Sequence, residues 1–235
     1  MSDTVFHSQA AFVLHQQHYR ESSLIIDALT QDLGRISLIA KGVRKPKSKT
    51  AGVLRPFAAL SLSFVGKTEL KTLTNVEIIG LPYELPGLAL YCGFYVNELV
   101  CSFLHQYDPH PEVFQDYQEC LIGLAQGESC EAALRVFELN LMDNIGYGVQ
   151  LGYDSRHEKP IDPNKKYVCT KESGLVEDSG GQFSGTALQA MEQRRFDNHQ
   201  VLSEAKMLMR TVIDSHLQGK QLKSRSVINN IVKRL

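Results

Sequence analysis

The sequence has no run of about 18 apolar residues, the length that a helix needs to cross a bilayer. Its first 20 residues also lack the charged-then-apolar pattern of a secretory signal peptide, because His, Gln and Arg interrupt every apolar stretch. These two absences lead us to expect a cytoplasmic protein that makes no contact with a membrane.

Cysteines are few, and none are paired in sequence. The five residues are odd in number and include no CxxC pair, which is typical of a reduced chain whose thiols pack as small core residues. Cys92, Cys101 and Cys120 fall at apolar positions of expected helices, which favours inert packing over a nucleophile. The eight histidines do not join the cysteines at metal-ligand spacing, so we expect no metal and no other cofactor.

Signatures of catalysis are missing as well. Gly66-Lys67-Thr68 matches the end of a phosphate-binding P-loop, but Ser61 stands where the pattern needs glycine, and the segment leads into a strand. No serine lies in a nucleophile elbow, and His157-Glu158 lacks the second histidine of a zinc protease. We therefore predict that the chain is not an enzyme. The alternative of a metal-dependent nuclease needs a carboxylate cluster, whereas the acids of residues 81–165 are spread at the spacing of solvated helix faces.

Charge is nearly balanced in total but divided along the chain. The 235 residues carry a net charge of −1, yet residues 81–165 alone hold 13 acidic and 4 basic residues. Between Asp32 and Glu69 there is no acid at all, while eight cations lie there: Arg35, Lys41, Arg44, Lys45, Lys47, Lys49, Arg55 and Lys67. Such an unopposed positive segment suits a polyanion such as a nucleic acid, although a solvated loop is the plainer interpretation.

The first 80 residues read as short strands separated by turns. Alternating or β-rich runs cover residues 11–15, 23–30, 35–41, 58–65 and 70–79, with turns at Asp32-Leu33-Gly34 and Gly66-Lys67-Thr68. Five strands in this length predict a small closed barrel. Gly42 and Pro46 keep the segment Lys41–Lys49 irregular, and a five-stranded barrel with a cationic loop is typical of an OB-fold that follows a phosphate backbone.

The aromatic candidates for base stacking are Phe12, Tyr19, Phe57 and Phe64. We expect Phe64 in the core, whereas Tyr19 and Phe57 flank turns.

Helical periodicity replaces the strands from Leu88 onward. We predict helices from Leu88, from Pro111, and from about Ser129 to Gly146, then again over residues 186–192 and 201–217, followed by a basic tail. Residues 150–183 lose this period and indicate an irregular or short-strand insertion. The expected fold is therefore α+β and multidomain, with an OB-fold barrel in residues 1–80 and a helical domain in residues 81–235.

Four segments, in order, are similar to those of the bacterial RecO family of DNA repair and recombination mediators: AFVLHQQHYRESSLIIDALTQDLGRISLIAKGVRKPKS, LYCGFYVNELV, LRVFELNLMDNIGYGV and GKQLKSR. The resemblance implies an OB-fold followed by a helical domain, without turnover of a bond. It implies binding to single- and double-stranded DNA, annealing of complementary strands, and work with RecR and often RecF in loading RecA onto strands coated by single-strand-binding protein (SSB). It also implies a place at the bacterial nucleoid.

One departure from the family concerns zinc. Many members carry two CxxC pairs after the GYG segment, where they hold zinc, but this chain has only Cys169 there. The resemblance therefore implies a degenerate zinc-finger region at about residues 150–183, and we expect ordinary packing to hold it.

DNA contacts are expected on the basic segment and its flanks: Arg35, Lys41, Arg44, Lys45, Lys47, Lys49, Arg55 and Lys71. A second contact is possible at Lys220, Lys223 and Arg225, which match the family's GKxLKSR segment, although a role as helix-end charges is equally consistent. A generic OB-fold nucleic-acid-binding module without a mediator role is the alternative to the family's function.

The SSB C-terminal tail is acidic and ends in an apolar tip, and the resemblance places its pocket in the helical domain. Arg135 matches the arginine of the family's LRxFEL segment, so it is our candidate for binding the tail. The alternative is an intrahelical ion pair of Arg135 with Glu131 or Glu138, at spacings of four and three residues. Phe137 is expected in the core.

Overall fold

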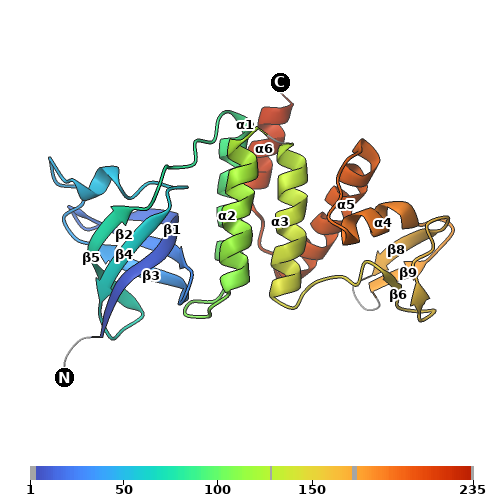
Figure 1. Cartoon of the computed structure of the whole chain (residues 1–235), viewed down its shortest axis with the longest axis horizontal. Helices are drawn as coiled ribbons and strands as arrows, with labels where there is room; N and C mark the ends of the chain where they lie inside the picture. Colours follow the sequence, from blue (N-terminus) through green and yellow to red (C-terminus); the bar gives the residue numbers. More distant parts are fainter. Residues whose placement is uncertain (1–3, 128, 171–173, 234–235) are drawn as a thin grey trace. The chain divides into compact units, whose positions relative to one another are not determined.

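The computed structural model describes residues 4–127, 129–170 and 174–233 (Figure 1). The chain forms two compact units. The first contains the residues up to Gly127 together with those from Leu222 onward, and the second contains Glu128–Gln221. No helix among the described residues has the length and apolarity that a membrane crossing requires.

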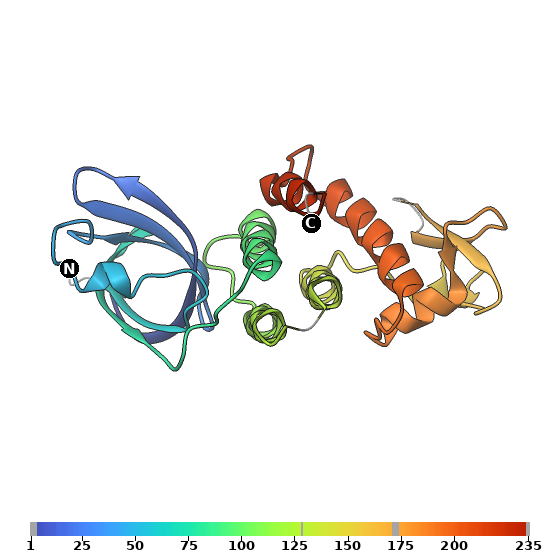
Figure 2. The ribbon, with the colours of Figure 1, turned by 90° about the horizontal axis from the view of Figure 1, so that it is seen from above.

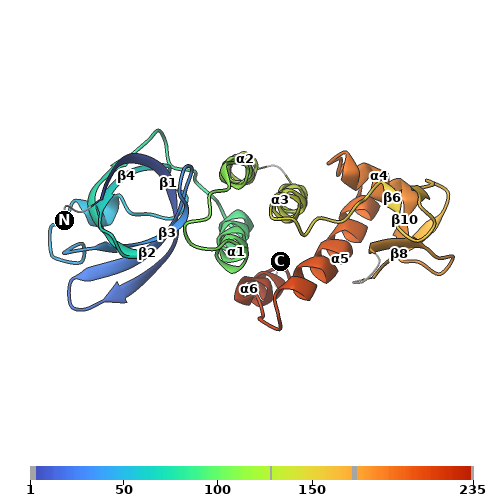
Figure 3. The same ribbon diagram turned by 90° about the horizontal axis from the view of Figure 1, so that it is seen from below.

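The first unit is built on a closed barrel of five strands: β1 (Val5–Tyr19), β2 (Ser23–Thr30), β3 (Gly34–Ala40), β4 (Leu60–Val65) and β5 (Leu70–Ile78). Their order around the barrel is β1-β2-β3-β5-β4, and β4 pairs with β1 to close it (Figure 3). Neighbours are antiparallel except β3 and β5, which are parallel. This is the predicted OB-fold barrel.

Alternation of side chains explains why these residues form a barrel. Along β3 and β4 every second residue is buried, so that Ile36, Leu38, Leu60, Leu62 and Phe64 reach 0% exposure in the barrel core. The expected core position of Phe64 is thereby confirmed. Both predicted turns are also confirmed, because β2–β3 and β4–β5 are antiparallel hairpins.

β1 is much longer than the predicted strand at residues 11–15. It pairs with β4 along its first half and with β2 along its second, and its register shifts between Phe6 and Gln9 and again between Val13 and His15. Such bulges bend a strand sharply, which lets one strand serve two neighbours in a closed barrel. They also break the simple alternation that sequence analysis relies on.

Three helices belong to the same unit: α1 (Leu88–Phe103), α2 (Pro111–Ala125) and α6 (Lys223–Val232). The buried ring of Phe12, on β1, lies 5.0 Å from that of Tyr117, on α2. Tyr117 donates a hydrogen bond to Asn97 on α1 (2.6 Å), and Asn97 donates to the carbonyl of Leu14 (2.9 Å). These buried contacts fix α1 and α2 on the outer surface of the barrel.

α6 is a helix where we predicted only a basic tail. Its N-terminus is held by Glu98 of α1, whose carboxylate accepts hydrogen bonds from the backbone N–H groups of Lys223 and Ser224, both at 2.9 Å. No residue of α6 itself is fully buried. The helix is therefore stabilised by a cap from a residue 125 positions earlier, which sequence periodicity does not report.

The second unit contains α3 (Cys130–Asn144), α4 (Gly185–Glu192) and α5 (His199–His216), and the described residues between α3 and α4 form five short strands. β8 (Lys166–Thr170) pairs with β9 (Gly174–Glu177) and β10 (Phe183–Ser184), while β6 (Tyr153–Asp154) pairs with β7 (Lys159–Pro160). Figure 2 shows these strands beside α4 at one end of α5. The predicted short-strand insertion is confirmed, and Ser129 caps α3 through its side chain, as its expected start requires.

Candidate nucleic-acid interface

The connection between β3 and β4 carries the basic segment and is anchored to the barrel. Val43 and Leu54 are each 3% exposed and belong to the barrel core, and Phe57 is 4% exposed. Most of the polar residues between these apolar anchors are exposed. The exposed cations of this basic loop are Lys41, Arg44, Lys45, Lys47, Lys49 and Arg55.

The basic loop is also joined to the turn between β1 and β2. The backbone N–H of Arg44 donates to the carbonyl of Ser22 (2.9 Å), and its guanidinium donates to the carbonyl of Arg20 (3.2 Å). Arg20 is exposed, and its guanidinium carbon lies 5.1 Å from the centre of the Tyr19 ring. The structure thus adds Arg20 to the basic surface.

An open hollow of about 690 Å³ lies where the turn and the loop meet. Its lining residues are Arg20, Glu21, Ser22, Ser23, Ile39, Lys41, Gly42 and Lys45. Three of the lining residues are cations and one is an acid.

Two cations of this surface have an unusual backbone conformation. Arg20 and Lys47 adopt left-handed conformations, with φ of 52° and 69°, which is uncommon for residues other than glycine.

Sequence analysis missed Arg20 because it lies 21 residues before Lys41 and next to Glu21. The signal that identifies Arg20 is strand pairing. Tyr19 at the end of β1 pairs with Ser23 at the start of β2, and β2 in turn pairs with β3. This pairing brings the β1–β2 turn to the end of β3 where the basic loop begins.

Two other predicted cations have internal partners. Arg35 donates hydrogen bonds to the carbonyls of Cys101 and Leu104 (3.1 Å to Leu104), at the C-terminal end of α1. Lys71 is 7% exposed; its ammonium group donates to the carbonyl of Thr68 (3.0 Å) and lies 4.5 Å from the centre of the Tyr107 ring. The structure does not bring Arg35 and Lys71 together with the exposed cations of the basic loop.

The aromatic candidates for base stacking are mostly inside the protein. Phe12, Phe57 and Phe64 are 4% exposed or less, so Phe57 is buried even though it flanks a turn. Phe57 is covered by Phe94 of α1, at 5.2 Å between ring centres. Tyr19 alone of the four is half-buried at the edge of the basic surface. This surface therefore offers many cations that can contact phosphates, but of the four aromatic candidates only Tyr19 to stack on a base.

The C-terminal cations take different positions. Lys220 and Lys223 are exposed, whereas the guanidinium carbon of Arg225 lies 5.9 Å from the centre of the Tyr95 ring on α1. Lys220 belongs to the second unit, and Lys223 and Arg225 to the first. A DNA contact at these three residues stays a prediction.

Arg135 lies on α3 with 7% of its surface exposed, and its guanidinium donates to Glu138 at 2.7 Å. This is the intrahelical pair that the spacing of three residues offered as the alternative. Glu131, the other possible partner, pairs instead with Lys206 of α5 (2.8 Å), and the hydrogen bond from Lys206 lowers the pKa of Glu131. Phe137 is 1% exposed, as expected of a core residue. Tail binding by Arg135 stays a prediction, and the side chain has an evident structural contact.

The expected inert packing of Cys92, Cys101 and Cys120 agrees with their burial. Cys92 and Cys120 are buried, and burial raises the pKa of the Cys101 thiol to about 11 despite the nearby Arg35 guanidinium. A thiol with such a pKa is almost entirely protonated at neutral pH, so it is a poor nucleophile and a poor metal ligand.

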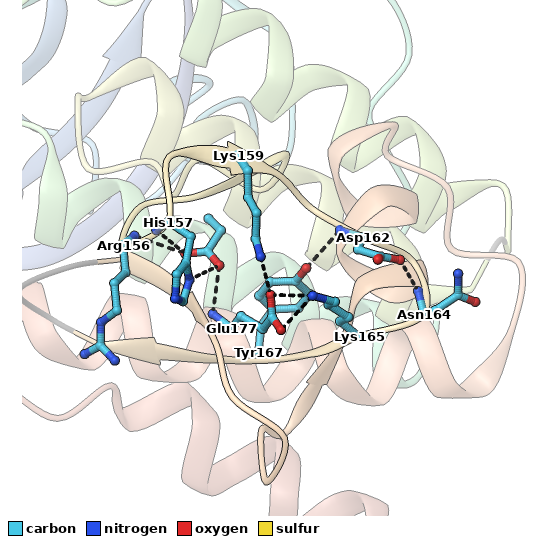
Figure 4. A network of polar contacts seen from close by, with 9 residues as sticks. Arg156, His157, Lys159, Asp162, Asn164, Lys165, Tyr167 and Glu177 are labelled. Carbon is cyan, nitrogen blue, oxygen red and sulfur yellow. Dashed lines mark hydrogen bonds and ion pairs between the residues drawn. The ribbon is translucent and has the colours of Figure 1, made fainter.

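Among the described residues of the second unit, Asp154, His157 and Glu177 bring three potential metal-ligand atoms within 4.8 Å of one another, inside the 150–183 insertion where we expected a degenerate zinc-finger region. Asp154 is fully buried; its two carboxylate oxygens accept the backbone N–H groups of Arg156, His157 and Glu177, and Nδ1 of His157 lies 2.8 Å from Oδ2. Glu177 pairs with the ammonium groups of Lys159 (2.6 Å) and Lys165 (2.8 Å) (Figure 4). Zinc does not fit this donor set, because the Asp154 carboxylate already accepts three backbone N–H groups and the Glu177 carboxylate already pairs with two ammonium groups.

The closed β1-β2-β3-β5-β4 barrel with its exposed cationic loop defines an OB-fold protein with an attached helical part. Residues 1–82 match the family model described as Recombination protein O N terminal, and residues 87–226 match Recombination protein O C terminal. The chain therefore belongs to the RecO family of DNA repair proteins.

Individual relatives agree along nearly the whole chain. The DNA repair protein RecO of Methylococcus capsulatus is 42% identical over 222 residues, covering 94% of this chain and 92% of that protein. Those of Burkholderia pseudomallei and Glaesserella parasuis are 42% and 38% identical, covering 94% and 95% of this chain and 82% and 95% of their own lengths. Membership in this family supports a role in DNA repair and recombination.

Proposed function

We propose that the chain binds single- and double-stranded DNA through the basic loop and Arg20, and that it anneals complementary strands. The observation that carries this proposal is the set of exposed cations on an anchored loop of an OB-fold barrel. Two DNA strands repel each other through their phosphates, and cations that neutralise these phosphates lower the cost of bringing the strands together. Annealing of this kind needs no catalytic group, since no covalent bond forms or breaks.

Arg35 and Lys71 serve this function through the fold. Arg35 ties β3 to the C-terminal end of α1, and Lys71 packs under Tyr107. Lys220, Lys223 and Arg225 are each proposed as further DNA-contacting residues.

The mediator role rests on family membership. We propose that the chain acts in the cytoplasm at the bacterial nucleoid, with RecR and often RecF as partners. There it binds the C-terminal tail of SSB and helps to load RecA onto SSB-coated single strands. A generic OB-fold nucleic-acid-binding module would handle bare DNA equally well but would have no preference for SSB-coated DNA.

Annealing of complementary oligonucleotides that are precoated with SSB separates these possibilities. We expect the chain to anneal them when SSB carries its C-terminal tail and to lose most of this activity when the tail is deleted. Equal activity with both forms of SSB contradicts the mediator proposal. Failure to anneal bare oligonucleotides contradicts the annealing proposal.

The same assay locates the site. Replacement of Lys45, Lys47 and Lys49 with Ala is expected to slow annealing of bare strands. The control replaces the same number of exposed cations in the second unit, Arg156, Lys166 and Arg210, with Ala. An equal loss in the control variant contradicts the assignment to the basic loop.

A further inference from the structure

The hollow between the β1–β2 turn and the basic loop contains one acidic residue, Glu21, among the cations Arg20, Lys41 and Lys45. Glu21 is exposed, and it makes no ion pair with any of the described residues. The cations that line the hollow therefore balance the Glu21 charge only at longer range, without a direct ion pair. A carboxylate in this position repels any phosphate that enters the hollow.

The position of Glu21 is set by the fold. Because Tyr19 pairs with Ser23, residues 20–22 form a three-residue turn with Glu21 at its centre. Arg44 holds this turn on both sides, through the carbonyl of Arg20 and the carbonyl of Ser22. The acidic residue thus stays at the edge of the basic surface.

We propose that Glu21 limits the affinity of the basic surface for DNA, so that bound strands and annealed duplex are released. This inference rests on the proposed function, because it assumes that phosphates occupy the surface around the hollow. A protein that anneals strands must let go of the product, and one like charge among phosphate-binding cations weakens all DNA sequences alike. Glu21 is then an affinity-setting residue of the DNA site.

The magnitude follows from Coulomb's law in water. At about 6 Å from a phosphate, one negative charge lowers the affinity about twofold at the dielectric constant of water and physiological salt. Glu21→Gln keeps the shape of the side chain and removes its charge, so we expect about a twofold tighter complex at physiological salt. The slope of log affinity against log salt stays the same, because no additional phosphate contact forms.

Asp32 provides a matched control on the same hairpin. It is exposed and acidic, but it lies in the β2–β3 turn, at the opposite end of the eight-residue strand β2. At about 3.3 Å per residue the two ends of β2 are more than 20 Å apart. This distance exceeds the Debye length of about 8 Å at physiological salt, so Asp32→Asn is expected to leave DNA affinity unchanged.

The experiment measures the dissociation constant of a fluorescent oligo-dT and of a labelled duplex for the full chain and four variants: Glu21→Gln, Asp32→Asn, Lys41→Ala/Lys45→Ala, and the triple control Arg156→Ala/Lys166→Ala/Arg210→Ala. The inference predicts tighter binding by Glu21→Gln to both DNAs, weaker binding by Lys41→Ala/Lys45→Ala, and no change for the other two. Release of a preformed complex into excess competitor DNA is expected to be slower for Glu21→Gln.

Each of the other outcomes contradicts either the inference about Glu21 or the proposed DNA site. If Lys41→Ala/Lys45→Ala binds weakly while Glu21→Gln matches Asp32→Asn, the DNA site stands and the inference about Glu21 fails. If Glu21→Gln binds more weakly than the unchanged chain, Glu21 organises the cations instead of opposing the phosphates, and the inference also fails. If Lys41→Ala/Lys45→Ala binds as tightly as the unchanged chain, the proposed DNA site itself is wrong.

Discussion

At the scale of single residues, the cations of this chain differ by what their charged groups contact. Lys45 and Lys47 are exposed on the basic loop. Arg35, Lys71 and Arg135 have carbonyl, aromatic or carboxylate partners in the protein. A cation that already has an internal partner must break that contact before it binds a ligand, so the exposed residues are the better candidates for phosphate binding.

Arg135→Ala is expected to destabilise the protein, by about 3 kcal/mol, because it leaves the buried Glu138 without its charged partner. Chemical denaturation measures this loss. The double variant Arg135→Leu/Glu138→Leu removes both charges and is expected to recover most of it.

Binding of an SSB-tail peptide to the folded double variant then tests the predicted tail contact separately from stability. A weakening by about 1–3 kcal/mol, with DNA binding unchanged, supports a direct contact of Arg135 with the peptide. Unchanged peptide binding contradicts it and leaves Arg135 with its structural role alone.

At the scale of elements, Asp154 links three short strands of the second unit. It lies on β6, which pairs with β7, and it accepts a hydrogen bond from the N–H of Glu177 on β9 (3.2 Å). Burial by itself raises the pKa of Asp154, but the hydrogen bonds from the His157 side chain and from three backbone N–H groups outweigh it and lower the pKa from 3.8 to about 2. The carboxylate therefore stabilises the folded state only while it is ionised.

Asp154→Asn is expected to lower the free energy of unfolding at pH 7 by about 2–3 kcal/mol, because an amide accepts fewer of these hydrogen bonds. The depressed pKa makes the carboxylate's contribution complete above pH 3.8 and lost as the pH falls toward 2. The difference between the two proteins should narrow over that interval.

Urea unfolding at several pH values measures this difference, with the exposed neighbour Glu158→Gln as the control. A constant difference down to pH 2 contradicts the role of the Asp154 charge. A chelator that lowers the stability of the unchanged chain contradicts the prediction that no metal is held.

Elements with regular periodicity could be predicted from the sequence, and those that depend on distant partners could not. The strand at residues 23–30 and the helix start at Pro111 agree with the structure, because alternation and an N1 proline are local signals. Sequence analysis missed α6, which depends on a cap from Glu98. It also missed the first half of β1, which depends on bulged pairing with β4.

The candidate site shows the same division. The basic loop could be identified from its composition, because no acid occurs between Asp32 and Glu69. Arg20 and Glu21 could not, because only the closed barrel brings the β1–β2 turn to this loop. Burial of Phe57 and Lys71 could not be read from the sequence either, because Phe94 covers the one and Tyr107 the other only in the folded chain.

At the scale of the whole molecule, one loop of the barrel unit carries six exposed cations and no acid, while residues 81–165 carry a net charge of −9, from 4 basic and 13 acidic residues. A protein with a net charge of −1 thereby has a surface that attracts a polyanion. The central claim of this account is that the basic loop binds DNA through phosphates and not through bases.

The salt dependence of single-strand binding tests this claim most directly. If about five phosphates are engaged, log affinity falls against log salt with a slope of about −3.5, at about −0.7 per contact. Lys45→Ala/Lys47→Ala/Lys49→Ala is expected to flatten the slope by about 2 and to weaken all DNA sequences alike, whereas Arg156→Ala/Lys166→Ala/Arg210→Ala leaves it unchanged. An unchanged slope in the loop variant, or a loss that depends on the DNA sequence, would contradict the claim.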